Sequence, residues 1–181
     1  MTRIIAGAYG GRRIQTPKGD GTRPTSDRVR EALFSSLESE LGGFEGLRVL
    51  DLFAGSGALG LEALSRGAEH AVFVEANTAA ASVVKRNVAD LGASGTVVRT
   101  KAERWVEDGD RDAFDLVLVD PPYAMATAAL AELVAAVDRS FAAPDALFVV
   151  ERATRDPFTW PDTVEPLRSK KYGETTIWYG R

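Results

Sequence analysis

Residues 49–60 read VLDLFAGSGALG, and this stretch decides the fold class of the chain. Its apolar first part suits a buried strand, while Gly55, Gly57 and Gly60 allow a tight turn in which the backbone approaches a ligand closely. In open α/β sheets such a turn follows the carboxyl end of a strand, begins a helix and borders the cofactor crevice. The stretch therefore predicts a strand, a ligand-binding loop and a helix, in that order.

Two acidic residues near this loop indicate the kind of cofactor. Glu75 ends the next predicted strand, where its carboxylate can bind ribose hydroxyls, so the glycine spacing also fits a dinucleotide site. Asp51 stands where a pyrophosphate-binding loop normally has an apolar residue. Its charge would repel pyrophosphate but attract the ammonium and sulfonium groups of S-adenosylmethionine. We therefore expect S-adenosylmethionine as the cofactor, and a nicotinamide-dependent oxidoreductase is the alternative that the glycine spacing leaves open.

The predicted cofactor-binding residues are Asp51, Phe53, Ala54, Gly55, Gly57, Glu75 and Ala102. The backbone near Ala102, after the third strand, is expected to meet the adenine edge. Lys101 occupies a position where many such enzymes carry an acidic residue, so the adenine contact from this turn is left open.

The rest of the chain alternates predicted strands and helices. Apolar runs such as 116–119 and 147–150 suit strands that are covered on both faces. The helices between them supply the crossovers that parallel neighbours require, so we predict a doubly wound, mostly parallel α/β sheet. Its predicted strands are 48–52, 71–75, 96–99, 114–120 and 146–151, its helices are 59–65, 78–91, one through Trp105 and 126–141, and an antiparallel hairpin of 164–171 and 175–179 closes the sheet.

The N-terminal segment has a pattern of its own. Residues 3–14 alternate apolar and polar side chains around a glycine turn, which predicts a β-hairpin. A helix is expected to begin at a cap on Thr25 or Ser26 and to end at Gly42. We accordingly divide the chain into a basic N-terminal β-hairpin extension, residues 1–20, and one domain, residues 21–181.

Charge is unevenly distributed along the chain. The first 30 residues hold seven basic and two acidic side chains, a net charge of +5, which leaves −9 for the rest of a chain whose total is −4. A basic arm on an acidic body is expected where one face meets phosphates, although a solvated arginine-rich terminus fits the charge equally well.

Composition excludes several kinds of site. The chain has no cysteine and a single histidine, His70, so disulfides, thiolate metal sites and a cysteine nucleophile are excluded, and we expect no metal. No apolar run is long enough for a membrane span, and the first residues lack a signal peptide, so we expect a cytoplasmic protein.

A second motif, Asp120-Pro121-Pro122-Tyr123, follows the apolar strand predicted at 114–120 and should face the same crevice as the glycine loop. Hydrogen bonds to the Asp120 carboxylate and the Pro121 carbonyl could make an exocyclic amino group of a nucleobase nucleophilic, and Pro122 stiffens the turn. Tyr123 offers a ring against which a flipped base could stack. Taken alone, the motif could also be a strand stop beside a core aromatic residue.

The sequence resembles the RsmD-type family of bacterial 16S ribosomal RNA guanine-N2 methyltransferases. The resemblance covers nearly the whole chain and rests on RIIAG at 3–7, GGR at 10–12, RPT at 23–25, DRVRE at 27–31, LF at 33–34, VLDLFAGSG at 49–57, DPPY at 120–123 and KKYG at 170–173. The N-terminal stretches carry the specificity, because the glycine loop and DPPY mark amino-group methyltransferases in general.

This resemblance implies a class I, Rossmann-like methyltransferase with a seven-stranded sheet. It also implies methylation of N2 on one guanine, of the guanine 966 type, in an assembling 30S subunit by a monomeric enzyme. The catalytic residues would be Asp120, Pro121, Pro122 and Tyr123. The residues implied in RNA binding are Arg3, Arg12, Arg13, Arg23, Thr25, Arg28, Lys170 and Lys171.

Two alternatives remain beside this expectation. An adenine-N6 DNA methyltransferase faces the same chemical problem, although no segment of this chain is large enough for a separate DNA-recognition domain. A non-catalytic RNA-binding module for ribosome assembly could use the same fold.

Overall fold

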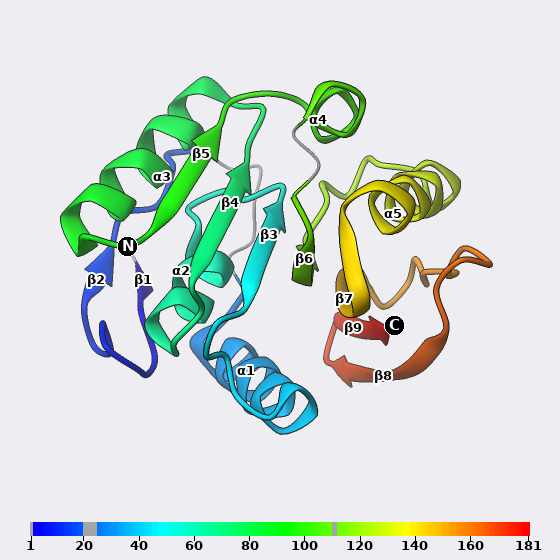
Figure 1. Ribbon diagram of the computed structural model, residues 1–181, viewed down its shortest axis with the longest axis horizontal. Coiled ribbons are helices and arrows are strands. Elements are labelled where there is room, and N and C mark those ends of the chain that lie inside the picture. Colours follow the sequence, from blue (N-terminus) through cyan, green and yellow to red (C-terminus); the bar gives the residue numbers. More distant parts are fainter. Residues whose placement is uncertain (1, 20–24, 110–111) are drawn as a thin grey trace.

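The computed structural model describes residues 2–19, 25–109 and 112–181, which form a twisted sheet with helices on both faces (Figure 1). The main sheet of these residues has seven strands in the order β5-β4-β3-β6-β7-β9-β8. Strands β3 to β7 run parallel, and β9 runs antiparallel to both of its neighbours. The strands are β3 (Arg48–Leu52), β4 (His70–Val74), β5 (Gly95–Val98), β6 (Phe114–Val119), β7 (Ala142–Ala153), β8 (Pro166–Tyr172) and β9 (Thr175–Gly180). This arrangement confirms the predicted fold class.

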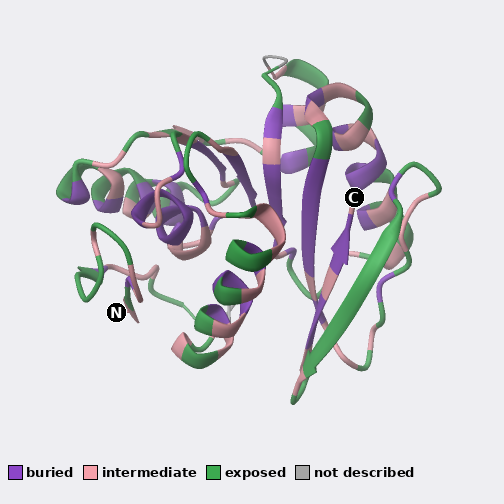
Figure 2. Ribbon diagram, turned by 60° about the horizontal axis from the view of Figure 1, so that its bottom comes forward, coloured by how far each residue is buried: buried purple, intermediate pink, exposed green. Residues whose placement is uncertain are grey.

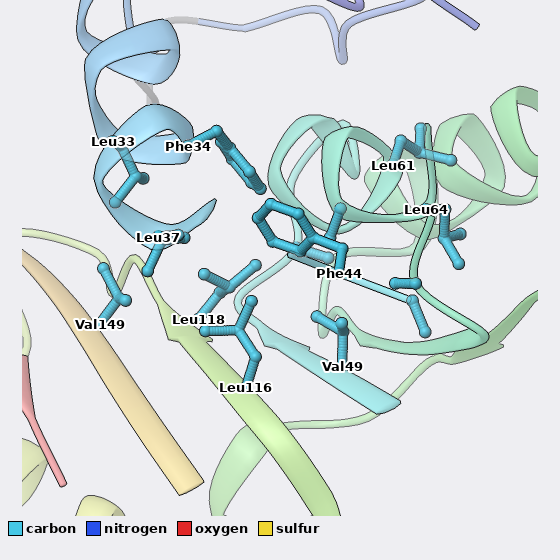
Figure 3. Packing of buried hydrophobic residues seen from close by; sticks show 14 of the residues in the cluster. Leu33, Phe34, Leu37, Phe44, Val49, Leu61, Leu64, Leu116, Leu118 and Val149 are labelled. Atoms are coloured by element: carbon cyan, nitrogen blue, oxygen red, sulfur yellow. The ribbon is translucent and has the colours of Figure 1, made fainter. Parts of the chain in front are cut away.

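Helices cover both faces because each crossover between parallel strands needs one. Helices α1 (Asp27–Leu41), α2 (Ala58–Ser65) and α3 (Thr78–Leu91) pack on one face, and α4 (Ala102–Asp108) and α5 (Thr127–Phe141) on the other (Figure 1). Successive strand residues alternate between the two cores. Leu116 and Leu118 meet Phe34 and Phe44 on the first face, as Figure 3 shows, while Val117 belongs to the second core.

The edges of the sheet differ from its centre. The central strands are buried almost throughout, whereas β8 is exposed along nearly its whole length (Figure 2). Strand β7 begins at Ala142, earlier than the predicted residue 146. Pro144 and Asp145 interrupt the apolar pattern there, and the pairing with β6 shifts register between Phe114 and Leu116. The sequence pattern therefore revealed only the regular part of β7.

The predicted N-terminal hairpin is present but has very short strands. Strands β1 (Thr2–Arg3) and β2 (Arg13–Ile14) pair antiparallel, and between them the chain bonds both to itself, at Ile4 with Gly11 and Arg12, and to α2. Ile4 and Ile14 are buried in the same core as α1 and α2. The proposed division of the chain at residues 20 and 21 lies outside the described residues. The cap expected before α1 is Ser26, whose hydroxyl accepts a hydrogen bond from the Val29 amide, and Gly42 ends the helix in a left-handed conformation.

One buried carboxylate ties the hairpin to the domain. The side chain of Glu62, on α2, is fully buried and accepts hydrogen bonds from the amides of Ile5 and Ala6 at 2.8 and 3.1 Å. It also forms ion pairs with Arg66 and with the buried Arg30 of α1, at 3.0 and 3.9 Å. A single side chain therefore connects three parts of the chain that are distant in sequence.

Glu62→Gln is expected to lower the free energy of unfolding by about 3–5 kcal/mol, because it removes the fully buried partner of Arg30 and leaves that guanidinium with the partly exposed Asp27 as its counter-charge. Chemical denaturation should show this loss, and hydrogen exchange should show faster opening at the amides of Ile5 and Ala6. The matched control is Asp108→Asn, which breaks the exposed Arg104–Asp108 pair and should cost less than about 1 kcal/mol. Equal losses in the two variants would contradict the anchoring role of Glu62.

Candidate active site

A cavity of about 850 Å³ follows the carboxyl ends of β3, β4, β6 and β7. This volume suits a ligand the size of a nucleoside cofactor together with part of a substrate. The predicted residues that line it are Asp51, Phe53, Ala54, Gly55, Glu75, Ala102, Asp120, Pro121, Pro122, Tyr123 and Thr25. The structure thus brings both sequence motifs into one cavity.

The glycine loop reaches this cavity through an unusual backbone path. Phe53 and Gly55 have positive φ angles of 59° and 60°, which turn the chain sharply after β3. Gly57, in contrast, is buried and does not line the cavity. A β-carbon there would lie 3.0 Å from Val84, so Gly57 allows α2 to pack closely, and its predicted contact with the cofactor stays a prediction.

Glu75 is fixed by the loop that it faces. Its two carboxylate oxygens accept hydrogen bonds from the backbone amides of Gly55, at 3.1 Å, and Asn77, at 3.2 Å. Each oxygen keeps a lone pair for a further donor. The carboxylate is therefore held at the cavity wall and can still accept hydrogen bonds from ribose hydroxyls.

Asp51 is almost completely buried beneath the loop, at 1% exposure. Its Oδ2 accepts a hydrogen bond from the amide of Gly60 at 3.0 Å. Burial raises the pKa of Asp51 to about 8, the charge of Glu75 adds to the rise, and the Gly60 hydrogen bond opposes it. A buried carboxylate of this kind is stabilised in its charged form by a cation, which the ammonium and sulfonium groups of S-adenosylmethionine would provide. The residues present therefore fit this cofactor.

Asp120 lies beside the cofactor loop because of strand register. Val119, the last residue of β6, pairs with Leu52 of β3 on one side and with Val150 of β7 on the other. Asp120 follows Val119 directly and lines the cavity between these two neighbours. Burial raises the pKa of Asp120 well above its usual value, and the negative charges of Glu151 and Asp51 raise it further.

The structure adds Glu151, which the sequence analysis did not single out. Glu151 follows Val150, so it lies next to Asp120 at the carboxyl end of β7 and lines the same cavity. Its Oε2 accepts a hydrogen bond from the hydroxyl of Thr25 at 2.9 Å. Burial raises the pKa of Glu151, against the effect of this hydrogen bond. Its position directly after an apolar strand, like that of Asp120, was the available sequence signal.

The ring of Tyr123 is accessible at the mouth of the cavity. Tyr123 is 56% exposed, whereas Pro121 is buried. Tyr123 is therefore not a core aromatic residue, and its ring is free to stack on a base. The loop beyond it is held by Arg152, whose guanidinium donates to the Met125 carbonyl at 2.9 Å and pairs with Asp156.

The predicted RNA-binding residues fall in different places. Arg3 pairs with Asp27, the first residue of α1, and Arg13 and Arg28 are exposed. Arg12 donates to the carbonyl of Asp90, in the last turn of α3, at 2.7 Å. That turn lies ~20 Å along the helix from the end that borders the cavity. Arg23 lies outside the described residues.

Lys170 and Lys171 lie on the exposed strand β8. Lys170 pairs with Ile177 of β9, and Ile177 pairs with Glu151 of β7, so Lys170 is level with the cavity edge. Lys170 is therefore aligned with Glu151 at a distance of two strands, whereas Lys171 is aligned with Arg152, and neither lysine lines the cavity. The segment 16–19, which the sequence analysis left without a function, also lines the cavity.

Two further findings concern the described part of the chain. It contains no group of three or more His, Cys, Asp or Glu residues arranged to hold a metal ion. It also contains no helix with the length and apolarity needed to cross a membrane.

The sheet order and the cavity at the carboxyl ends of its parallel strands define a class I methyltransferase fold. A family profile described as "Conserved hypothetical protein 95" matches residues 2–181. The chain belongs to this family, which is the RsmD family that its sequence resembles. The predicted family is therefore confirmed.

Relatives and solved structures agree with this assignment. The Ribosomal RNA small subunit methyltransferase D of Haemophilus influenzae is 34% identical over 94% of this chain and 89% of that protein. The Escherichia coli K12 protein of the same name is 42% identical over 67% of this chain and 60% of that protein. A hypothetical protein of Thermus thermophilus has a similar structure, with a TM-score of 0.84, 30% identity and coverage of 99% and 98% of the two chains. These similarities also support S-adenosylmethionine as the cofactor.

Cofactor affinity is expected to rise with pH, because a cation is bound best when Asp51 is ionised and the pKa of Asp51 is about 8. Below that pKa the empty site carries a proton that binding must release, so the Kd should increase by up to about tenfold per pH unit. Titration calorimetry with S-adenosylmethionine between about pH 6 and pH 9 measures the Kd and the proton release. Asp51→Asn should bind weakly with little dependence on pH. A Kd that is constant over this range in the wild type would refute the linkage.

Proposed function

We propose that this protein uses S-adenosylmethionine to methylate the N2 amino group of one guanine in 16S ribosomal RNA. The proposed target is of the guanine 966 type, in an assembling small subunit, and the enzyme would act as a cytoplasmic monomer. The observation that carries the proposal is the position of Asp120 and Pro121 in the same cavity as Asp51 and Glu75. Family membership supports ribosomal RNA as the substrate.

In this proposal Asp120 and Pro121 activate the amino group. The Asp120 carboxylate and the Pro121 carbonyl each accept a hydrogen bond from one N–H of the amino group, which directs the nitrogen lone pair towards the cofactor. When bound, S-adenosylmethionine supplies a methyl group on a positively charged sulfur. Asp120 would accept the proton that the amino nitrogen loses on taking the methyl group, and the cofactor would leave as a neutral thioether.

The remaining site residues would hold the RNA. Tyr123 offers its exposed ring to the flipped guanine, a contact worth ~1–3 kcal/mol in single-strand binders. Lys170 and Lys171 would contact phosphates near the cavity, and Arg12 and Arg13 would contact them farther away on the hairpin. This arrangement requires an RNA surface wider than one nucleotide.

Three alternatives predict different results. An adenine-N6 DNA methyltransferase would label duplex DNA with radioactive cofactor, whereas we expect label in small-subunit RNA. A nicotinamide-dependent oxidoreductase would bind NAD and not S-adenosylmethionine in calorimetry. A non-catalytic RNA-binding module would bind the RNA and leave it unlabelled. Mapping the methylated nucleotide in ribosomal RNA from cells with and without this protein identifies the base and the atom directly.

Asp120→Ala is expected to reduce the rate of methyl transfer by at least ~100-fold, because it removes one of the two acceptors for the amino group. RNA binding and the folded structure should be retained, since the change also removes a carboxyl group whose burial is unfavourable. Single-turnover methylation and RNA binding are the measurements, and Asp162→Ala, at an exposed position, is the control. Normal methylation by Asp120→Ala would favour a non-catalytic role for the motif.

Replacing Arg12 and Arg13 by Ala is expected to weaken RNA binding and to lower the slope of log K against log salt by up to about 2. The control is the double replacement of Arg104 and Arg139, which lie on α4 and α5 away from the hairpin. Binding is measured over a series of salt concentrations. An unchanged slope in the Arg12 and Arg13 variant would remove the hairpin from the RNA interface.

A further inference from the structure

The proposed methyl transfer gives no role to two carboxylates that line the cavity, Glu103 and Glu151, and Glu151 is the one next to Asp120. The strand order β3-β6-β7 places it on the side of Asp120 that faces away from Asp51 and the glycine loop. Neighbouring strands lie ~4.8 Å apart, so Glu151 is within one side-chain length of the group that Asp120 holds. If Asp120 holds the amino group of a base, the ring nitrogen beside that amino group would therefore face Glu151.

We propose that Glu151 selects guanine by accepting a hydrogen bond from its N1–H. This inference rests on the proposed function, because it assumes that the amino group at Asp120 is N2 of guanine. In guanine the carbon that bears this amino group lies between N1, which carries a hydrogen, and N3, which carries a lone pair. In adenine the one ring nitrogen next to the amino-bearing carbon carries only a lone pair. An ionised carboxylate is purely an acceptor, so it attracts the edge of guanine and repels that of adenine.

Thr25 positions the Glu151 side chain. Its hydroxyl donates to Oε2 at 2.9 Å, which fixes the carboxylate and leaves Oε1 for another donor. Thr25 belongs to the N-terminal segment that carries the family resemblance and is 126 residues away in the sequence. The N-terminal stretches that carry the family resemblance thus include a residue, Thr25, that contacts the proposed base-selecting residue, Glu151.

The surroundings of Glu151 give it no cation of its own among the residues that the structure describes. The guanidinium of the next residue, Arg152, is directed to Asp156 and to the Met125 carbonyl instead. Across the strands β7, β6 and β3, the carboxylates that follow Glu151 are Asp120 and then Asp51. In the other direction, the basic Lys170 lies two strands away from Glu151. Burying the ionised carboxylates of Asp120 and Glu151 side by side without a cation is unfavourable. Hydrogen bonds from the N–H groups of a bound base would stabilise both carboxylates.

The test uses small subunits reconstituted with 16S ribosomal RNA in which the mapped target is either guanine or 2-aminopurine. 2-Aminopurine keeps the amino group at C2 but has a lone pair at N1 in place of N–H. The wild type should prefer guanine in kcat/KM by about 10- to 100-fold. Glu151→Gln should reduce this preference by about tenfold or more, because its amide can donate to N1 of 2-aminopurine. Thr25→Val should reduce it to a smaller extent.

The control is Glu107→Gln, the same change at an exposed position of α4, which should leave the preference unchanged. Calorimetry should show unaltered S-adenosylmethionine binding in Glu151→Gln, and thermal unfolding checks its fold. If that variant does not fold, Thr25→Val decides the question. Methylation of guanine N2 with the same preference in the wild type and the variants would overturn the inference alone. Wild-type methylation of any other atom would overturn the proposed function, and the inference with it.

Discussion

The parallel register of β3, β6 and β7 is the constraint on which the site depends. It brings the ends of β3 and β6 level with Val150 of β7, so that Asp51 lies beneath the loop after β3 while Asp120 and Glu151 directly follow Val119 and Val150. Side chains of residues paired in register share one face of the sheet. A cofactor loop, an amino-group acceptor and an additional carboxylate are therefore adjacent, although 100 residues of sequence separate Asp51 from Glu151. A shift of one residue in the pairing would turn these side chains to the opposite face.

Ionising several carboxylates in one partly buried cavity is unfavourable in free energy, and their raised pKa values reflect this. Burial raises the pKa values of Asp51, Asp120 and Glu151, so the empty site favours protons over charge. The fold limits this cost with backbone and hydroxyl donors, such as the Gly60 amide and the Thr25 hydroxyl. A cationic cofactor and the N–H groups of a base would provide the remaining compensation. The same desolvation that opposes charge in the empty cavity would strengthen the interactions of bound ligands.

The N-terminal segment is part of the same physical unit. Glu62 and Arg30 fix the hairpin and α1 to α2, which begins at the glycine loop. Asn87, on α3, bonds to the backbone of Gln15 and to the carbonyl of Ser56 in that loop. Thr25 completes these connections by its bond to Glu151. A segment that would bind RNA is thus connected by direct contacts to the residues around the reacting groups, which gives the basic arm a defined position relative to the cavity.

The sequence by itself determined the order of strands and helices, the glycine loop and the Asp120 motif, because apolar periodicity, glycines and prolines are local properties. It also indicated the family, through short stretches spread over the chain. It did not indicate that Gly57 supports packing instead of lining the cavity, or that Arg30 is buried with Glu62, because both depend on contacts between distant segments. Glu151 shows the difference most clearly. Its place after an apolar run was visible in the sequence. Only the pairing of β7 with β6 made it a neighbour of Asp120, and only the tertiary structure brought the Thr25 hydroxyl within hydrogen-bond distance of it.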